Sequence, residues 1–286
     1  MRKSDRPEAF VAGPDEELYI YYLKGRVTPG MDLSSPGFIG NWEEDDFSFL
    51  FYRQACRKRI AALLAAQPQL EMIDTFQMPY AEWLGERPAA YRVGRFDIVP
   101  IWEMERKERD AGACLHRLIL DPGVVFGSGT HATTRDCLHA LEIVYAEEDL
   151  QSVIDLGSGT GVLSLAATAL GSRSTLAVDN NLLAVHTAAR NFRVNGMADR
   201  ILAVQGRAEV FIEHPADLLL ANIHFDVMRR LVKSAGFLQK KWFVLSGLMR
   251  SQAGSIGEQL VRVGSIVRQQ WIDENLWHTL LGMNPQ

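Results

Sequence analysis

A glycine-rich turn in the second half of the chain has the spacing of a ligand-binding site. The apolar, strand-like residues 153–156 run directly into Gly157, Gly159 and Gly161, and an apolar helical pattern follows. Glycine adopts positive φ at such a turn and lets the backbone approach a ligand closely. The turn is not a dinucleotide fingerprint, because Val162 occupies the place of its third glycine. It is not a phosphate-binding P-loop either, because no Gly-Lys-Ser/Thr follows.

Two carboxylates beside this turn indicate the ligand. Asp155 lies two positions before the first glycine, where it would repel a phosphate group and favour a positively charged ligand. Asp179 ends the next strand-like run, 22 residues after Gly157, and a carboxylate at such a position can accept hydrogen bonds from both hydroxyls of a ribose. A ribose without phosphate, together with a positive charge, describes S-adenosylmethionine. We therefore predict that this cofactor binds at the turn, as in a methyltransferase.

A second glycine-rich segment, residues 121–134 (DPGVVFGSGTHATT), precedes an amphipathic helical pattern. Thr133 or Thr134 is expected to be the N-cap of that helix. Because the helix leads into the first strand of the sheet, the loop before it is expected to lie over the cofactor. The candidate cofactor contacts in this loop are Phe126, Gly127, Thr130 and His131, and His131 is also a candidate base.

A third segment carries candidates for the chemical step. The apolar strand-like residues 218–221 end in Asn222, which is followed by Ile223 and His224. The side-chain carbonyl of Asn222 and the backbone carbonyl of Ile223 could each accept an N–H of an acceptor amine, and His224 is a candidate base. Asp226 is expected to cap the helix that follows, residues 227–238, rather than to take part in chemistry.

An α/β fold is needed to bring these segments together. After about Gly112, short apolar runs alternate with helical patterns, as in a doubly wound, Rossmann-like sheet with helices on both faces. The runs expected as buried parallel strands are residues 153–156, 175–179, 201–204, 217–223 and 242–246. Their carboxyl ends then share one edge, where ligands bind in such sheets. The last two extended runs, residues 265–272 and 277–283, predict a C-terminal antiparallel hairpin.

The N-terminal part follows a different pattern. Extended runs at residues 17–24, 47–52, 69–78 and 95–101 surround a helical pattern at 53–66. This order predicts a small α+β domain over residues 1–102, which could recognise the substrate. The polar residues 103–114 are expected to form a linker, and residues 115–286 the cofactor-binding domain.

Composition sets limits on the function. The chain has 286 residues, of which 47% are hydrophobic and 23% charged, as in globular proteins. A net charge of −5 does not favour nucleic-acid binding, and the basic stretch from Arg53 to Arg59 is expected to be a solvated helix face. No apolar run is long enough to cross a bilayer, so we expect no membrane contact. Cys56, Cys114 and Cys137 form no CxxC pair, so no disulfide scaffold and no metal site are expected, and the expected location is the cytoplasm.

The three segments together resemble the bacterial methyltransferases of the ribosomal large-subunit protein L-eleven, from roughly Tyr91 to the C-terminus. The resemblance is carried by DPGVVFGSGTHATT, VIDLGSGTGVLSLAA, AVDNN, ANI and the late strand VLSGL. It implies cofactor contacts at Thr134, Gly157, Asp179 and Asn222. Asn180, which follows Asp179, is a further candidate cofactor contact. The resemblance also implies S-adenosylmethionine-dependent methylation of amino groups, on lysine side chains and the N-terminus, of a ribosomal protein.

Two features depart from that family. His224-Phe225 replaces small or aliphatic residues after Asn-Ile, and Asn-x-x-aromatic is similar to the Asn-Pro-Pro-Tyr signature of methyltransferases acting on glutamine amides or nucleobase amines. In addition, residues 25–46 offer no first helix for a ferredoxin-like substrate domain. Two alternatives therefore stay open: an N-methyltransferase of a glutamine amide, nucleobase or small molecule, and a cofactor-binding protein without turnover. A third alternative is a nicotinamide oxidoreductase, because the same sheet could host one.

Overall fold

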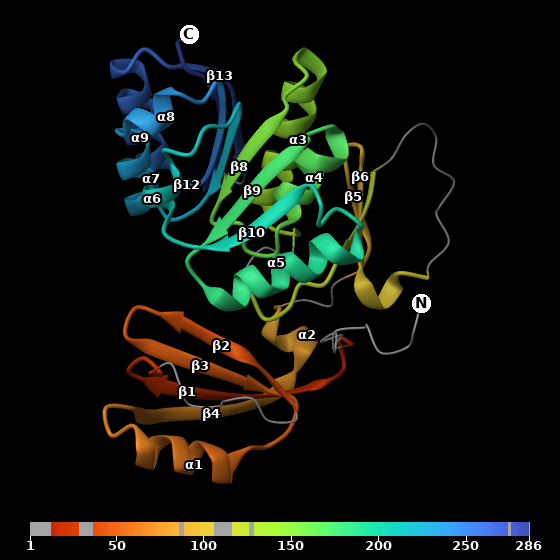
Figure 1. The fold of residues 1–286 in the computed structure, drawn as a ribbon, viewed down its shortest axis with the longest axis vertical. Coiled ribbons are helices and arrows are strands. Elements are labelled where there is room, and N and C mark those ends of the chain that lie inside the picture. The colour runs from red at the N-terminus through yellow and green to blue at the C-terminus, as the bar shows by residue number, and fades with distance from the viewer. Residues whose placement is uncertain are drawn as a thin grey trace. The chain divides into compact units, whose positions relative to one another are not determined.

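The computed structural model describes residues 13–28, 37–85, 89–105, 116–125, 129–273 and 276–285. The chain divides into two compact units (Figure 1). The first unit runs to residue 88 and includes Gly123–Val125, and the second comprises Ala89–Pro122 and Phe126–Gln286. Among the described residues, no helix is both long and apolar enough to span a membrane.

The first unit is a four-stranded antiparallel sheet in the order β2-β3-β1-β4. Its strands are β1 (Glu17–Lys24), β2 (Phe38–Glu44), β3 (Phe47–Tyr52) and β4 (Glu71–Pro79), and the short helix α2 (Tyr80–Trp83) follows them. Helix α1 (Arg57–Ala66) buries Ile60 and Leu63 against one face of the sheet. The outer face of α1 exposes Arg57 and Lys58, which confirms that the basic stretch is solvated.

The second unit is built on a seven-stranded sheet in the order β10-β9-β8-β11-β12-β14-β13. The first five strands of that order are parallel, and β14 lies antiparallel between β12 and β13. The sheet therefore has the predicted doubly wound core and C-terminal hairpin. Its strands are β8 (Ser152–Leu156), β9 (Ser174–Asp179), β10 (Ile201–Gln205), β11 (Leu218–Asn222), β12 (Trp242–Met249), β13 (Ile266–Asp273) and β14 (Trp277–Met283).

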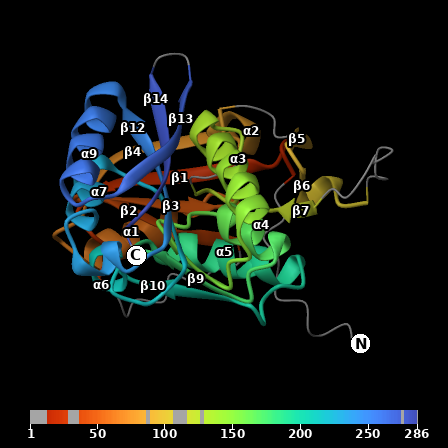
Figure 2. The ribbon, with the colours of Figure 1, turned by 90° about the horizontal axis from the view of Figure 1, so that it is seen from above.

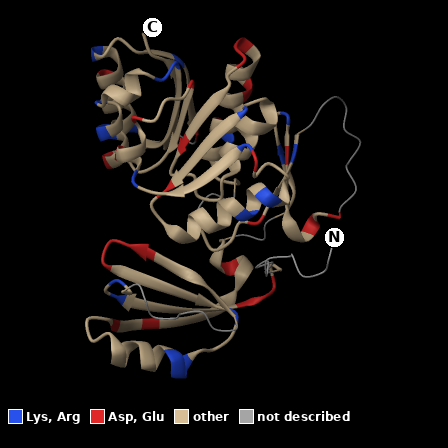
Figure 3. Cartoon of the chain, viewed as in Figure 1, with Lys and Arg blue, Asp and Glu red and all other residues tan. Residues whose placement is uncertain are grey.

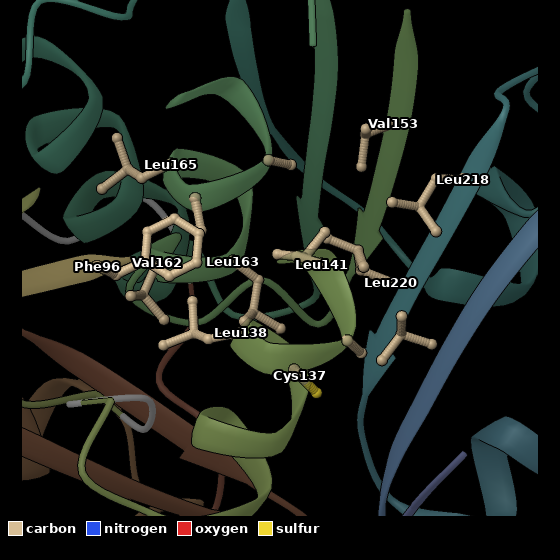
Figure 4. Packing of buried hydrophobic residues seen from close by; sticks show 14 of the residues in the cluster. Phe96, Cys137, Leu138, Leu141, Val153, Val162, Leu163, Leu165, Leu218 and Leu220 are labelled. Carbon is tan, nitrogen blue, oxygen red and sulfur yellow. The ribbon is translucent and has the colours of Figure 1, made fainter. Parts of the chain in front are cut away.

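Helices cover both faces of this sheet (Figure 2). On one face lie α3 (Ala132–Glu147), α4 (Val162–Leu170) and α5 (Leu182–Val194), and on the other α6 (Ala208–Phe211), α7 (Phe225–Leu231), α8 (Ala235–Leu238) and α9 (Arg250–Arg262). Figure 4 shows Leu138 and Leu141 of α3 gathered with side chains of α4 and of the central strands. Strands buried on both faces read as continuous apolar runs, which is why the sequence revealed them.

A small third sheet corrects the predicted domain boundary. It joins β5 (Tyr91–Val93), β6 (Phe96–Pro100) and β7 (His116–Leu120), and the 3-10 turn Ile101–Glu103 follows β6. The sequence assigned residues 89–102 to the first domain, but Phe96 and Ile98 of β6 are buried in the core of the second unit. An alternating apolar pattern identifies a strand without identifying the core that it joins. Residues 106–114 of the predicted linker lie outside the described residues.

Two helix starts also differ from the prediction. Helix α3 begins at Ala132, and its N-cap is His131, whose Nδ1 accepts a hydrogen bond from the backbone N–H of Thr133, so neither threonine is the cap. The predicted helix 227–238 is two short helices, because Ser234 caps α8 by accepting from the N–H of Phe237 at 3.1 Å. Asp226 lies inside the first turn of α7 and is not its cap.

Candidate functional site

The glycine turn lies at the carboxyl end of β8 and is tied to the end of β9. The backbone N–H groups of Gly157 and Ser158 both donate to the carbonyl of Val178, at 2.8 and 3.1 Å. Gly157, Gly159 and Gly161 have φ values of +78°, +53° and +80°, which confirms the predicted backbone conformation. Other residues adopt such angles only at a cost of about 1–2 kcal/mol.

Close packing is a second reason for glycine at this turn. A Cβ atom on Gly157 would lie 2.1 Å from Cγ2 of Ile223, and one on Gly161 would lie 2.4 Å from the ring of Phe192 in α5. The turn is therefore enclosed by Ile223, the residue after β11, on one side and by α5 on the other. Any side chain at these two positions would push the neighbouring elements away.

Asp179 links the glycine turn to the end of β9. Its Oδ2 accepts from the N–H of Gly159 and its Oδ1 from the N–H of Asn181, both at 2.9 Å. Burial raises the pKa of Asp179, although hydrogen bonds from neighbouring backbone N–H groups oppose that rise. A carboxylate offers about four acceptor positions. The carboxylate therefore keeps acceptor capacity for further donors such as ribose hydroxyls.

Asp155 has its hydrogen-bond partner inside the protein. Its side chain is 1% exposed, and Ser164 Oγ of α4 donates to Oδ2 at 2.6 Å. Burial raises the pKa of Asp155 to about 7, and the nearby charge of Asp179 adds to the rise. The sequence predicted that Asp155 contacts the ligand, but its carboxyl faces α4. It can act on a ligand at the turn through its charge.

Asn222 ends β11 and presents an uncovered acceptor. Its Nδ2 donates to Oγ1 of Thr133 at 3.1 Å, whereas no donor among the described residues reaches Oδ1. Gly247 of β12 lies beside it with φ +83°, and a Cβ atom there would lie 3.0 Å from Asn222 Oδ1 and 3.2 Å from the carbonyl oxygen of Ile223. The glycine keeps both oxygens free of a covering side chain. Both can therefore accept N–H groups from a bound molecule.

The other predicted residues lie around this centre in different environments. Thr134 is buried in the first turn of α3, Asn180 is exposed at the end of β9, and His224 is exposed at the start of α7. Phe225 packs against the core beneath the guanidinium of Arg229, 5.7 Å from its ring centre. Thr130 and His131 lie just before α3, and Phe126 and Gly127 lie outside the described residues.

One buried polar residue that the sequence did not reveal, Asn191, supports the site. Asn191 of α5 is fully buried, and its Oδ1 accepts from the N–H of Asp121 at 2.9 Å. Its Nδ2 donates to the carbonyls of Asp121 and Thr160, each at 2.9 Å. Asn191 thus joins the segment that leads into the loop to the glycine turn. An asparagine on the apolar face of an amphipathic helix was the available signal.

Comparisons with known proteins agree with this architecture. The family model described as "Ribosomal protein L11 methyltransferase (PrmA)" matches residues 49–284. A ribosomal protein L11 methyltransferase from Staphylococcus haemolyticus is 36% identical over 276 residues, which is 92% of this chain and 83% of the relative. One from Enterococcus faecalis is 34% identical over 198 residues, 68% of this chain and 61% of the relative. The family model and the Staphylococcus haemolyticus relative both extend well before Tyr91, where the predicted resemblance begins.

A solved structure shares the fold. The crystal structure of a ribosomal protein L11 methylase from Lactobacillus delbrueckii subsp. bulgaricus superposes with a TM-score of 0.59 at 22% sequence identity. The match covers 69% of this chain and 100% of that chain. At 22% sequence identity this similarity shows a shared fold alone.

Proposed function

The chain belongs to the ribosomal protein L11 methyltransferase family, and from this we propose that it transfers methyl groups from S-adenosylmethionine to amino groups of a ribosomal protein. The observation that carries the proposal is Asn222, whose Oδ1 stands uncovered at the carboxyl edge of the sheet. It lies at the end of β11, next to the strand whose end forms the glycine turn. This is the edge at which open α/β sheets bind their ligands.

The residues present fit S-adenosylmethionine. The remaining acceptor capacity of Asp179 suits ribose hydroxyls, and Ser158 Oγ is buried without a partner among the described residues. The pKa values of Asp155 and Asp179 are both raised by burial, so a positively charged ligand nearby would stabilise their charged forms. We propose that Asp179 and the turn from Gly157 hold the cofactor, together with Thr134 and Asn180. When bound, it supplies an electrophilic methyl group.

The chain's part in the chemistry is to orient an amine. A lysine amine with a pKa of about 10.4 must lose a proton before its lone pair can react. Asn222 Oδ1 and the carbonyl of Ile223 can accept the two remaining N–H groups and so direct the lone pair. This arrangement needs no dedicated base. His131 is already engaged as a helix cap, and His224 is exposed at the start of α7.

The proposed acceptor is a basic protein. Ribosomal proteins are generally basic, and the net charge of −5 favours their encounter with this chain. Acidic and basic residues are interspersed over the elements of each unit (Figure 3), so we do not expect direct binding of nucleic acid. We further propose that the first unit takes part in acceptor recognition and that the reaction takes place in the cytoplasm, where ribosomes assemble.

The test uses the full chain, methyl-labelled S-adenosylmethionine and ribosomes from a strain that lacks the family enzyme. Mass spectrometry should locate the label on amino groups of ribosomal protein L11, and Asn222→Ala should strongly reduce it. Label in RNA, or only in small molecules, would contradict the proposed acceptor and leave methyl transfer standing. Cofactor binding without any labelled product would indicate a binding protein instead.

A further inference from the structure

The side-chain amide of Asn222 has two ends, and only one can serve an acceptor amine. Oδ1 can accept an N–H, whereas Nδ2 can only donate. Because the two ends are nearly equal in size, something other than shape must decide which of them faces the acceptor. In the structure Nδ2 is turned toward Thr133 Oγ1, 3.1 Å away.

The partners of Thr133 determine that orientation. Its Oγ1 lies 2.8 Å from Nδ1 of His131, and its backbone N–H donates to the same nitrogen at 3.3 Å. A nitrogen that accepts this N–H carries no proton of its own. The hydroxyl proton of Thr133 therefore points to His131, and the Thr133 oxygen presents a lone pair to Asn222. Only the Nδ2 end of the amide can bind there.

We propose that Thr133 and His131 are positioning residues, which fix the Asn222 amide with Oδ1 toward the acceptor amine. Thr133 is 1% exposed, so a water molecule cannot replace its hydroxyl as the hydrogen-bond partner of Asn222. The ring of His131 is held edge-on against Trp277, with 5.2 Å between the ring centres. The functional part of this inference rests on the proposed amine methylation, whereas the hydrogen-bond chain itself can be measured without it.

Activity measurements test the functional part. Thr133→Val keeps the shape and removes the hydroxyl, and should lower kcat roughly tenfold, the worth of one hydrogen bond, while cofactor affinity changes little. Thr133→Ser should recover most of the loss. Thr187→Val is the matched control, since Thr187 is a buried threonine of α5 whose hydroxyl donates only to the carbonyl of Leu183. In an Asn222→Ala background, Thr133→Val should cause no further loss, because it acts through that amide.

Nitrogen NMR of the isotope-labelled protein tests the hydrogen-bond chain from His131 through Thr133 to Asn222 independently of turnover. His131 should be the tautomer with its proton on Nε2, and the Asn222 side-chain N–H should exchange slowly in the wild type and in Thr133→Ser but not in Thr133→Val. A proton on Nδ1 of neutral His131, or an additive loss in the Thr133→Val, Asn222→Ala double variant, would overturn the inference. An inactive wild type with the expected NMR signals would instead count against the proposed function.

Discussion

Replacing Asp179 with alanine should weaken S-adenosylmethionine binding by at least tenfold. The carboxylate keeps acceptor capacity beyond its bonds to the N–H groups of Gly159 and Asn181. A hydrogen bond to a charged acceptor contributes about 1.5–3 kcal/mol, so two ribose hydroxyls are worth roughly 3–6 kcal/mol before relaxation. Tenfold in affinity is only about 1.4 kcal/mol, so even a largely compensated loss should be measurable.

The same substitution also removes two hydrogen bonds from the folded protein, which calls for a control. Asp217 lies at the opposite, amino-terminal end of the sheet. Its Oδ2 accepts from the N–H groups of Gln151 and Ser152, at 3.0 and 2.8 Å, and from Ser152 Oγ at 2.8 Å. Asp217→Ala should therefore lower the free energy of unfolding at least as much as Asp179→Ala, and leave cofactor affinity unchanged.

Titration calorimetry gives the dissociation constant, and chemical denaturation gives the free energy of unfolding. The reasoning is refuted if Asp179→Ala binds S-adenosylmethionine as tightly as the wild type, or if Asp217→Ala weakens binding by the same factor. Asp179→Asn should be intermediate in affinity. Its amide keeps one acceptor oxygen but turns an N–H group toward a backbone donor.

Three further predictions concern other parts of the site. Asn222→Ala should lower kcat by a larger factor than it weakens cofactor binding, because its hydrogen bonds matter most in the transition state; equal factors would make it a binding residue only. Gly247→Ala should lower turnover, because its Cβ would press on the oxygens of Asn222 and Ile223, whereas Gly264→Ala, with a similar φ of +80° and no atom closer than 3.8 Å, should cost stability alone. Because burial raises the pKa of Asp155 to about 7, its stabilising contribution should be complete below pH about 4 and be lost as the pH rises through 7, and affinity for the cationic cofactor should rise over the same range. Denaturation and calorimetry at pH 5 and pH 8 test both trends, and Asp155→Asn should weaken both without removing them, because the raised pKa of Asp179 contributes in the same direction.

The sequence could predict features whose causes are local. Gly157, Gly159 and Gly161 need positive φ, and Asp179 and Asn222 end apolar strands, so the parallel-sheet rule alone brought them to one edge. The apolar runs that form the central parallel strands could be recognised because such strands are buried on both faces. These signals lie in consecutive residues, so a single sequence is enough to reveal them.

The features that the sequence did not reveal depend on contacts between distant elements. Thr133 meets Asn222 across 89 positions of the chain, and nothing in the loop sequence marks that partner. The apolar alternation of β6 was visible, but its burial with the second unit was not. The cap of α3 was misassigned because the His131 ring accepts from the Thr133 N–H, a role usually filled by serine, threonine, asparagine or aspartate.

Residues 119–121, which lead into the loop, form hydrogen bonds with two asparagine side chains in the pattern that a neighbouring strand would provide. Asn195, the C-cap of α5, accepts from the N–H of Ile119 and donates to its carbonyl, and Asn191 does the same for Asp121. Four residues of helix rise about 6.0 Å, and two residues of strand about 6.6 Å, so the two amides match the ladder spacing of β7. These bonds pair the backbone groups of Ile119 and Asp121, which would be costly to bury unpaired. The second N–H of Asn191 Nδ2 donates to the carbonyl of Thr160. Helix α5 therefore pairs the backbone of this segment and also fixes the position of the glycine turn relative to it.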